Sequence, residues 1–241
     1  MKSFYVGYLK MPRSLKGFYL WVTPLLLAVG LGFGVYVSSS QLPSGSGQWD
    51  PAQTASVQGL LTVAPYPVLH TADGGSILLV RAGKASAVEF VAPFDGQHIT
   101  LRGTPIERGG WRMMEVLRAD DVQRWSPSER IAAPQAEPSF TVTMEGEIVD
   151  SKCFLGVMKP GAGKVHRACA AMCLTGGMPP MLVVTDPAGD KYGYMLITDS
   201  GESASVQLVP DVAVPVAVTG TLEVRGDLTY LRMAPSGVSR I

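Results

Sequence analysis

One long apolar stretch lies close to the start of the chain. Residues 17–37 run for 21 positions without a charged side chain, which is long enough to cross a hydrocarbon layer of about 30 Å. Aromatic residues lie at both ends of the stretch, as in the interfacial belts of membrane helices: Phe18, Tyr19, Trp21 and Tyr36. A cleavable signal peptide is the alternative, but the run is long and no A-x-A site follows it. The pattern predicts one transmembrane helix over 17–37.

Beyond residue 37 the pattern changes to short apolar or alternating runs separated by glycine, which is typical of β-strands. Residues 38–52 are rich in Ser, Gly and Pro and predict a tether. Residues 126–138 are rich in Pro and Ala and predict a linker. These two segments bound a first β domain over 53–125 and a second over 139–241.

An internal repeat relates the two β domains. Residues 99–116 align without gaps with residues 216–233, a shift of 117 positions, and the shared G-T-x-x-x-R-G motif places turn glycines at Gly109 and Gly226. The opening strand at 57–61 aligns with 144–148 instead, a shift of 87. The second copy has therefore gained 30 residues, at about 150–180. We expect a mainly β protein with two duplicated, small OB-like barrels, the second carrying a helical insertion.

The distribution of charge predicts how the chain is oriented across the membrane. The chain has 20 basic and 20 acidic residues, and every charge before the apolar stretch is basic: Lys2, Lys10, Arg13 and Lys16. Because basic flanks stay in the cytoplasm, the leader 1–16 is predicted to be cytoplasmic and the barrels periplasmic, at a bacterial inner membrane. Neither an overall basic excess nor a basic-aromatic groove is present in the sequence, which argues against nucleic-acid binding.

All three cysteines lie within the insertion. Residues 164–174 have good helix formers, and Gly176 is a plausible C-terminal stop. On such a helix His166, Cys169 and Cys173 occupy positions i, i+3 and i+7, on one face. Cys153 can reach the same face from the preceding loop. The insertion therefore brings together three thiols and one imidazole.

Three interpretations of this cluster stay open. Cys153, His166, Cys169 and Cys173 form a ligand set suited to zinc, or to Cu(I) because thiolates are soft ligands. In an oxidising compartment the cysteines form a disulfide instead, Cys153–Cys169 or Cys153–Cys173, since i,i+4 cysteines in a helix are poorly placed to bridge each other. In the third interpretation, the odd thiol is reactive or pairs with a partner subunit.

The stretch from Gly146 to Pro180 resembles a segment of bacterial membrane-anchored extracytoplasmic proteins of unassigned function. Their pattern, G-x-[IV]-x-D-x-x-C-[YF]…H-x-x-C-A-x-x-C…G-G-x-P, is filled here by Gly146, Asp150, Cys153, His166, Cys169, Cys173, Gly176, Gly177 and Pro179. The resemblance covers about 35 residues. It implies an OB-like periplasmic domain that accompanies membrane redox or energy-converting machinery.

The sequence contains none of the common hydrolase, metalloprotease or nucleotide-binding motifs, so we expect a non-catalytic protein. We expect an accessory subunit of a respiratory or photosynthetic electron-transfer complex in the lipid bilayer. Gly30 and Gly34 form a small-xxx-small pair through which its helix can pack against the helices of other subunits. The alternative is a membrane-tethered periplasmic metal-binding (Cu or Zn) or thiol-redox protein that uses the Cys/His cluster.

Overall fold

A single helix forms the first of two structural units. The computed structural model describes residues 11–40 and 47–241, and the contacts divide the chain after Ser44 into two units. Helix α1 (Arg13–Ser40) contains an apolar stretch, Leu15–Ser40, in which an 18-residue window has a mean hydropathy of 1.9. This helix is long and apolar enough to span a membrane, and it contains the predicted segment 17–37. Most of the predicted leader, residues 1–10, lies outside the described residues.

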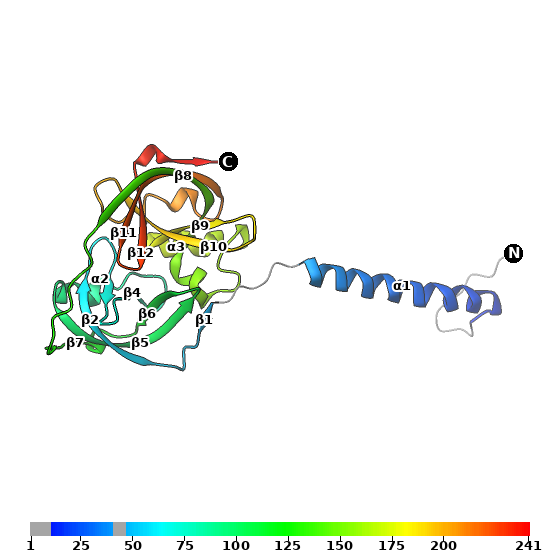
Figure 1. Cartoon of the computed structure of the whole chain (residues 1–241). Helices are drawn as coiled ribbons and strands as arrows, with labels where there is room; N and C mark the ends of the chain where they lie inside the picture. The colour runs from blue at the N-terminus through cyan, green and yellow to red at the C-terminus, as the bar shows by residue number, and fades with distance from the viewer. Residues whose placement is uncertain (1–10, 41–46) are drawn as a thin grey trace. The chain divides into compact units, whose positions relative to one another are not determined.

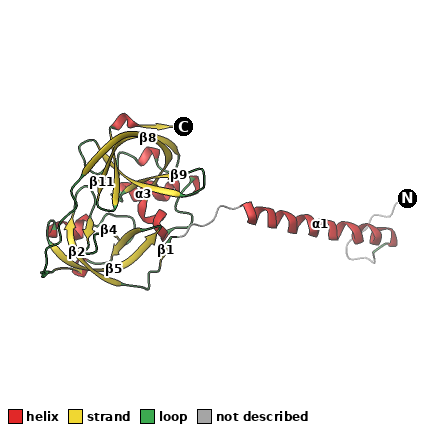
Figure 2. Ribbon diagram, viewed as in Figure 1, coloured by secondary structure: helices red, strands yellow, loops and turns green. Residues whose placement is uncertain are grey.

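The second unit is built mainly from β-strands (Figures 1 and 2). Its first half contains one short helix and seven strands: β1 (Gln48–Trp49), β2 (Ala55–Thr62), β3 (Val68–His70), β4 (Ser76–Arg81), α2 (Val88–Val91), β5 (His98–Arg108), β6 (Trp111–Val116) and β7 (Val122–Arg124). Its second half contains one helix and six strands: β8 (Glu137–Asp150), α3 (Arg167–Thr175), β9 (Pro180–Thr185), β10 (Lys191–Thr198), β11 (Pro215–Arg225), β12 (Leu228–Met233) and β13 (Val238–Arg240).

Each half closes into a five-stranded barrel. In the first, the order β2-β3-β4-β6-β5 returns to β2, and β1 and β7 pair with β5 outside the ring. In the second, the order β8-β9-β10-β12-β11 returns to β8, with β13 added to β11. Both rings contain one parallel pair, β4 with β6 and β10 with β12. Closure leaves the ring strands without free edges.

The predicted shift of 117 positions relates strands of the first barrel to strands of the second. Adding 117 to the bounds of β5 and β6 gives the bounds of β11 and β12. The same shift moves the parallel pair Leu78↔Met113 onto Met195↔Tyr230. Gly109 and Gly226 both have positive φ, at 54° and 61°, in the tight hairpins where glycine is needed. The repeat in the sequence is thus a repeat in register and in turn geometry.

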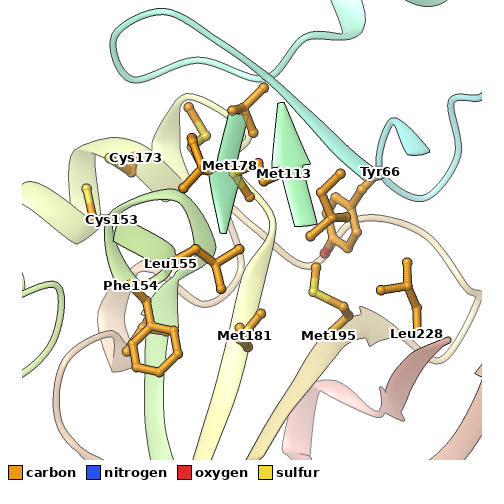
Figure 3. Close-up of a cluster of buried hydrophobic side chains, with 14 of the residues drawn as sticks. Tyr66, Met113, Cys153, Phe154, Leu155, Cys173, Met178, Met181, Met195 and Leu228 are labelled. Atoms are coloured by element: carbon orange, nitrogen blue, oxygen red, sulfur yellow. The ribbon is translucent and has the colours of Figure 1, made fainter. Parts of the chain in front are cut away.

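The barrels share a hydrophobic core rather than packing as separate bodies. One cluster of buried side chains combines Leu78, Ile106 and Met113 of the first barrel with Met181 and Met195 of the second, and Figure 3 shows this cluster. Cys153 and Cys173 lie at its edge, beside Leu155 and Met178 (Figure 3). Strands β5 and β11 alternate buried and more exposed positions over much of their length, whereas β3, β4 and β9 are buried at most positions. The insertion is therefore attached to the same core as the barrels.

The connecting segments are shorter than the composition suggests. Helix α1 continues to Ser40 and strand β1 begins at Gln48, so both enter the predicted tether 38–52, of which residues 41–46 lie outside the described part. Strand β8 begins at Glu137, inside the predicted linker 126–138. Composition does not detect β1, because its two residues are held by pairing with β5 and not by their own pattern.

Candidate functional site

The 30-residue insertion folds as two helical segments against the barrels. After β8, a π-helical turn spans Cys153–Val157, and a 3-10 turn over Lys164–His166 leads into α3. Gly161 allows the two segments to approach, since a Cβ there would lie 2.3 Å from the carbonyl oxygen of Cys153. Helix α3 ends with Gly176 as its C-cap, as predicted, and the positive φ falls one residue later, at Gly177.

The predicted ligands converge, but as two overlapping groups. The ligand atoms of Cys153, His166 and Cys169 all lie within 4.8 Å of one another, and so do those of Asp150, Cys153 and Cys173. Cys153 belongs to both groups. Cys173 is therefore adjacent to the first group without completing it. The cluster can hold a metal ion through three side chains, with a further thiol beside it.

The three cysteines are free thiols. The sulfur atoms of Cys153 and Cys169 are 4.0 Å apart, whereas a disulfide bond requires about 2.05 Å. Neither of the two bridges predicted from the sequence, Cys153–Cys169 and Cys153–Cys173, is formed in this structure. Cys153 nevertheless stands next to both partners, so the same side chains that suit a metal are also placed for oxidation.

The carboxylate of Asp150 contacts two residues of the cluster. It is fully buried, and its Oδ1 accepts a hydrogen bond of 2.9 Å from the backbone N–H of Cys153. Its Oδ2 is 2.9 Å from Nε2 of the buried His166. One carboxylate thus holds the backbone that carries one ligand and the ring of another. The sequence places Asp150 within the family-like pattern, but only the structure shows this role.

The pKa values of two neighbouring thiols, Cys153 and Cys173, are shifted in opposite directions. A hydrogen bond with Cys173 raises the pKa of Cys153, and burial and the charge of Asp150 act in the same direction. The same hydrogen bond lowers the pKa of Cys173, assisted by the positive charge of Lys84. Cys173 is therefore the member of this pair that ionises first, with Cys153 donating to it.

Lys84 joins the cluster from the other barrel. It belongs to the loop between β4 and α2, and its Nζ is 2.6 Å from Sγ of Cys169 and 3.8 Å from Sγ of Cys173. The close contact with Cys169 raises the pKa of Lys84. Sequence reasoning missed Lys84, because its loop carries no motif and lies 85 positions before Cys169. The cluster is thus completed where the barrels meet.

A buried ion pair holds the loop and the insertion together. Nζ of Lys152, one residue before Cys153, donates to the carbonyl oxygens of Arg81 and Gly83 at 2.7 and 2.9 Å and to Oε1 of Glu115 at 2.6 Å. These three bonds use all the donors of the ammonium group. Trp49 donates to the other oxygen of Glu115 at 3.2 Å. Full pairing is what allows a charged side chain to remain buried here.

Gly30 and Gly34 belong to α1, and a Cβ built at either position would have nothing within 4 Å. No family model, no curated protein and no solved structure matches the chain.

Proposed function

We propose that this chain is a membrane-tethered metal-binding protein whose Cys153, His166 and Cys169 hold Cu(I) or Zn(II). The observation that carries the proposal is the convergence of two sulfurs and one imidazole nitrogen within 4.8 Å of one another. Two thiolates and an imidazole form a soft donor set, which favours Cu(I) among the copper states and also suits zinc. Three protein ligands leave one position of a tetrahedral ion open to an exchanging partner.

The surroundings of the three ligands support the same proposal. A ligating histidine commonly bonds a carboxylate through its second nitrogen, which fixes the ring and raises its basicity. Asp150 engages Nε2 of His166 at 2.9 Å and so fixes the ring that carries the proposed ligand. Two bound thiolates would add negative charge, and Lys84 places a positive charge beside them. Cys173 supplies a neighbouring thiol to which the ion can pass.

Metal binding to the reduced full chain tests the proposal. We expect the protein, purified in detergent with a thiol reductant under anaerobic conditions, to retain one Cu(I) or Zn(II) per chain against a chromophoric chelator. Cys153→Ser and Cys169→Ser should weaken binding by more than the roughly 10- to 100-fold effect of outer-shell changes. Cys173→Ser is the matched control and should weaken it less. Absence of a bound ion, or equal binding by the Cys169→Ser variant, would contradict the proposal.

The location proposed for this site is the periplasmic face of a bacterial inner membrane. The basic residues before α1 favour a cytoplasmic N-terminus, which places the barrels outside. The barrels are proposed to be of the OB type, because five strands close with the third and fifth in parallel. Protease added to intact spheroplasts should digest residues 47–241, and protection of that region until the cells are lysed would reverse the proposed orientation.

A second candidate function is that of an accessory subunit of a respiratory or photosynthetic membrane complex, the setting that the resemblance of residues 146–180 implies. The open surface around Gly30 and Gly34 of α1 favours it, because small residues let another helix approach closely. We expect a Gly30→Leu, Gly34→Leu variant to leave the complex on a native gel, and a Leu31→Ala variant to stay. Migration of the unaltered chain as a monomer would contradict this candidate.

A further inference from the structure

The contact between Lys84 and Cys169 is too short for an ordinary hydrogen bond to sulfur. Nζ and Sγ are 2.6 Å apart. N–H···O bonds have lengths of about 2.9 Å, and sulfur is larger than oxygen, so N–H···S bonds are longer still. A separation of this size is expected when the nitrogen and the sulfur are each bonded to the same small atom between them.

The position of Lys84 is built by the fold on both sides of the residue. Before it, the carbonyl oxygens of Arg81 and Gly83 accept hydrogen bonds from the buried Lys152. After it, the backbone N–H of Ser86 donates to the carbonyl oxygen of Gly176 at 2.8 Å. The backbone of the loop is therefore fixed to the insertion at both ends, and only the side chain of Lys84 spans the remaining gap to Cys169.

We propose that Lys84 and Cys169 are a site of oxidative modification, at which dioxygen joins the amine to the sulfur through one oxygen atom as an N–O–S bridge. The reaction balances with one dioxygen molecule. One of its atoms forms the new N–O and O–S bonds, and the other leaves as water with the thiol hydrogen and one amine hydrogen. The nitrogen and the sulfur each lose two electrons, and dioxygen accepts all four.

Exposure explains why Cys169 is the thiol that reacts. Cys153 and Cys173 are buried, whereas Cys169 is partly accessible and Lys84 is exposed. Cys173 is also 3.8 Å from the amine, too far for a one-atom bridge without movement. Because thiol oxidation follows accessibility and thiolate character, dioxygen reaches the Cys169 sulfur first.

The consequence for the metal site rests on the proposed function. A sulfur in the bridge is no longer a free thiolate, so the bridged protein keeps only Cys153 and His166 of the converging group. A dithiol reductant cleaves the O–S bond, which returns the Cys169 thiol, leaves a hydroxylamine on Lys84 and converts the reductant to its disulfide. Oxidation thus switches off metal binding and covalently links the two barrels.

Peptide mass analysis tests the bridge directly. The full chain is purified anaerobically in detergent, and half is then exposed to air-saturated buffer before digestion at acidic residues. We expect linked peptides bearing Lys84 and Cys169 only in the air-exposed half of the preparation. Their mass should equal the sum of the two free peptides plus one oxygen atom minus two hydrogen atoms. The link should disappear on treatment with a dithiol reductant. The metal capacity of the air-exposed protein should fall in proportion to the fraction of chains that carry the link.

Two variants make the result specific. Lys84→Arg keeps the positive charge without the amine, so it should give no link after exposure to air. Cys173→Ser removes a neighbouring thiol and should still form the link. Unlinked peptides after exposure, or a Cys153–Cys169 disulfide as the sole product, would overturn the bridge. A link in a chain whose reduced form binds no metal would overturn the proposed function alone.

Discussion

A single buried carboxylate positions two of the three proposed ligands. Asp150 holds the backbone of Cys153 with one oxygen and the ring of His166 with the other. The first contact is to backbone and not to a sulfur, and the second holds the imidazole ring, so Asp150 is a positioning residue. A change at Asp150 removes none of the proposed donor atoms, so its effect should appear as a lower metal affinity.

Replacing Asp150 by Asn should weaken metal binding by about 10- to 100-fold, because the ring of His166 loses its charged partner. Chelator competition on the reduced full chain measures the change. Asp120→Asn, at an exposed carboxylate of the first barrel, is the matched control and should bind as the unaltered chain does. Equal affinities for the two variants would show that Asp150 does not act on the site.

The Lys152–Glu115 pair gives a second prediction at this scale. Lys152→Met leaves the carboxylate of Glu115 buried without its cation, which should cost about 3–5 kcal/mol of the free energy of unfolding. The double variant Lys152→Met, Glu115→Leu should recover most of that loss, because no uncompensated charge remains. Urea denaturation of the full chain in detergent measures both. An unfolding midpoint for the single variant equal to that of the unaltered chain would contradict the prediction.

Among the elements, the contact between α3 and the loop after β4 determines where the barrels meet. Gly176 lies directly against this loop, and a Cβ at that position would be 1.8 Å from the carbonyl oxygen of Lys84. The obstacle is backbone, which has no rotamer to change. The absence of a side chain at Gly176 therefore permits the approach of Lys84 to Cys169.

Gly176→Ala should lower stability by about 1–3 kcal/mol, the usual effect of overpacking, and should reduce the yield of the linked Lys84 and Cys169 peptides. The neighbouring Thr175→Ala is the control, since Thr175 is exposed and surface changes stay within about 0.5 kcal/mol. Thermal unfolding and peptide mapping measure the two effects. An unchanged yield of the link in Gly176→Ala would show that this close approach is not required.

The sequence predicted the elements that depend on local pattern and missed those that depend on long-range pairing. The gapless repeat located β5, β6, β11 and β12, because hairpin register and turn glycines are encoded within each segment. The spacing of His166, Cys169 and Cys173 located the cluster for the same reason, although only His166 and Cys169 converge with Cys153 and Cys173 belongs to the group of Asp150 and Cys153. Lys84 and Lys152 joined the site through contacts across the two barrels, and residues 69 to 85 positions apart leave no periodic signal.

At the scale of the whole molecule, Tyr66 connects the barrels through the interior. Its hydroxyl donates to the carbonyl oxygen of Leu196 at 2.6 Å and accepts from the N–H of Ala204 at 2.9 Å. Burial raises the pKa of Tyr66 from 10.0 to about 12. Because the folded state favours the neutral phenol, its contribution to stability is complete below pH 10 and is lost as the pH rises through about 12.

Unfolding of the full chain should therefore become easier above pH 10, in parallel with the tyrosinate absorbance. Tyr66→Phe should show a shallower decline above pH 10, since only other phenols such as Tyr230 then contribute. At neutral pH the variant should lose about 1–3 kcal/mol, because two buried backbone groups lose their partner. Ionisation of Tyr66 near pH 10 in the folded protein would contradict this account.

The division of the site between two barrels also sets an order of events during synthesis. Domains tend to fold from the N-terminus as the chain is made, so the loop with Lys84 is complete before Cys153 exists. The thiols then remain apart from their lysine until the second barrel closes and Lys152 reaches the carbonyls of the first. The proposed oxygen bridge can therefore form only in molecules in which the two barrels have met.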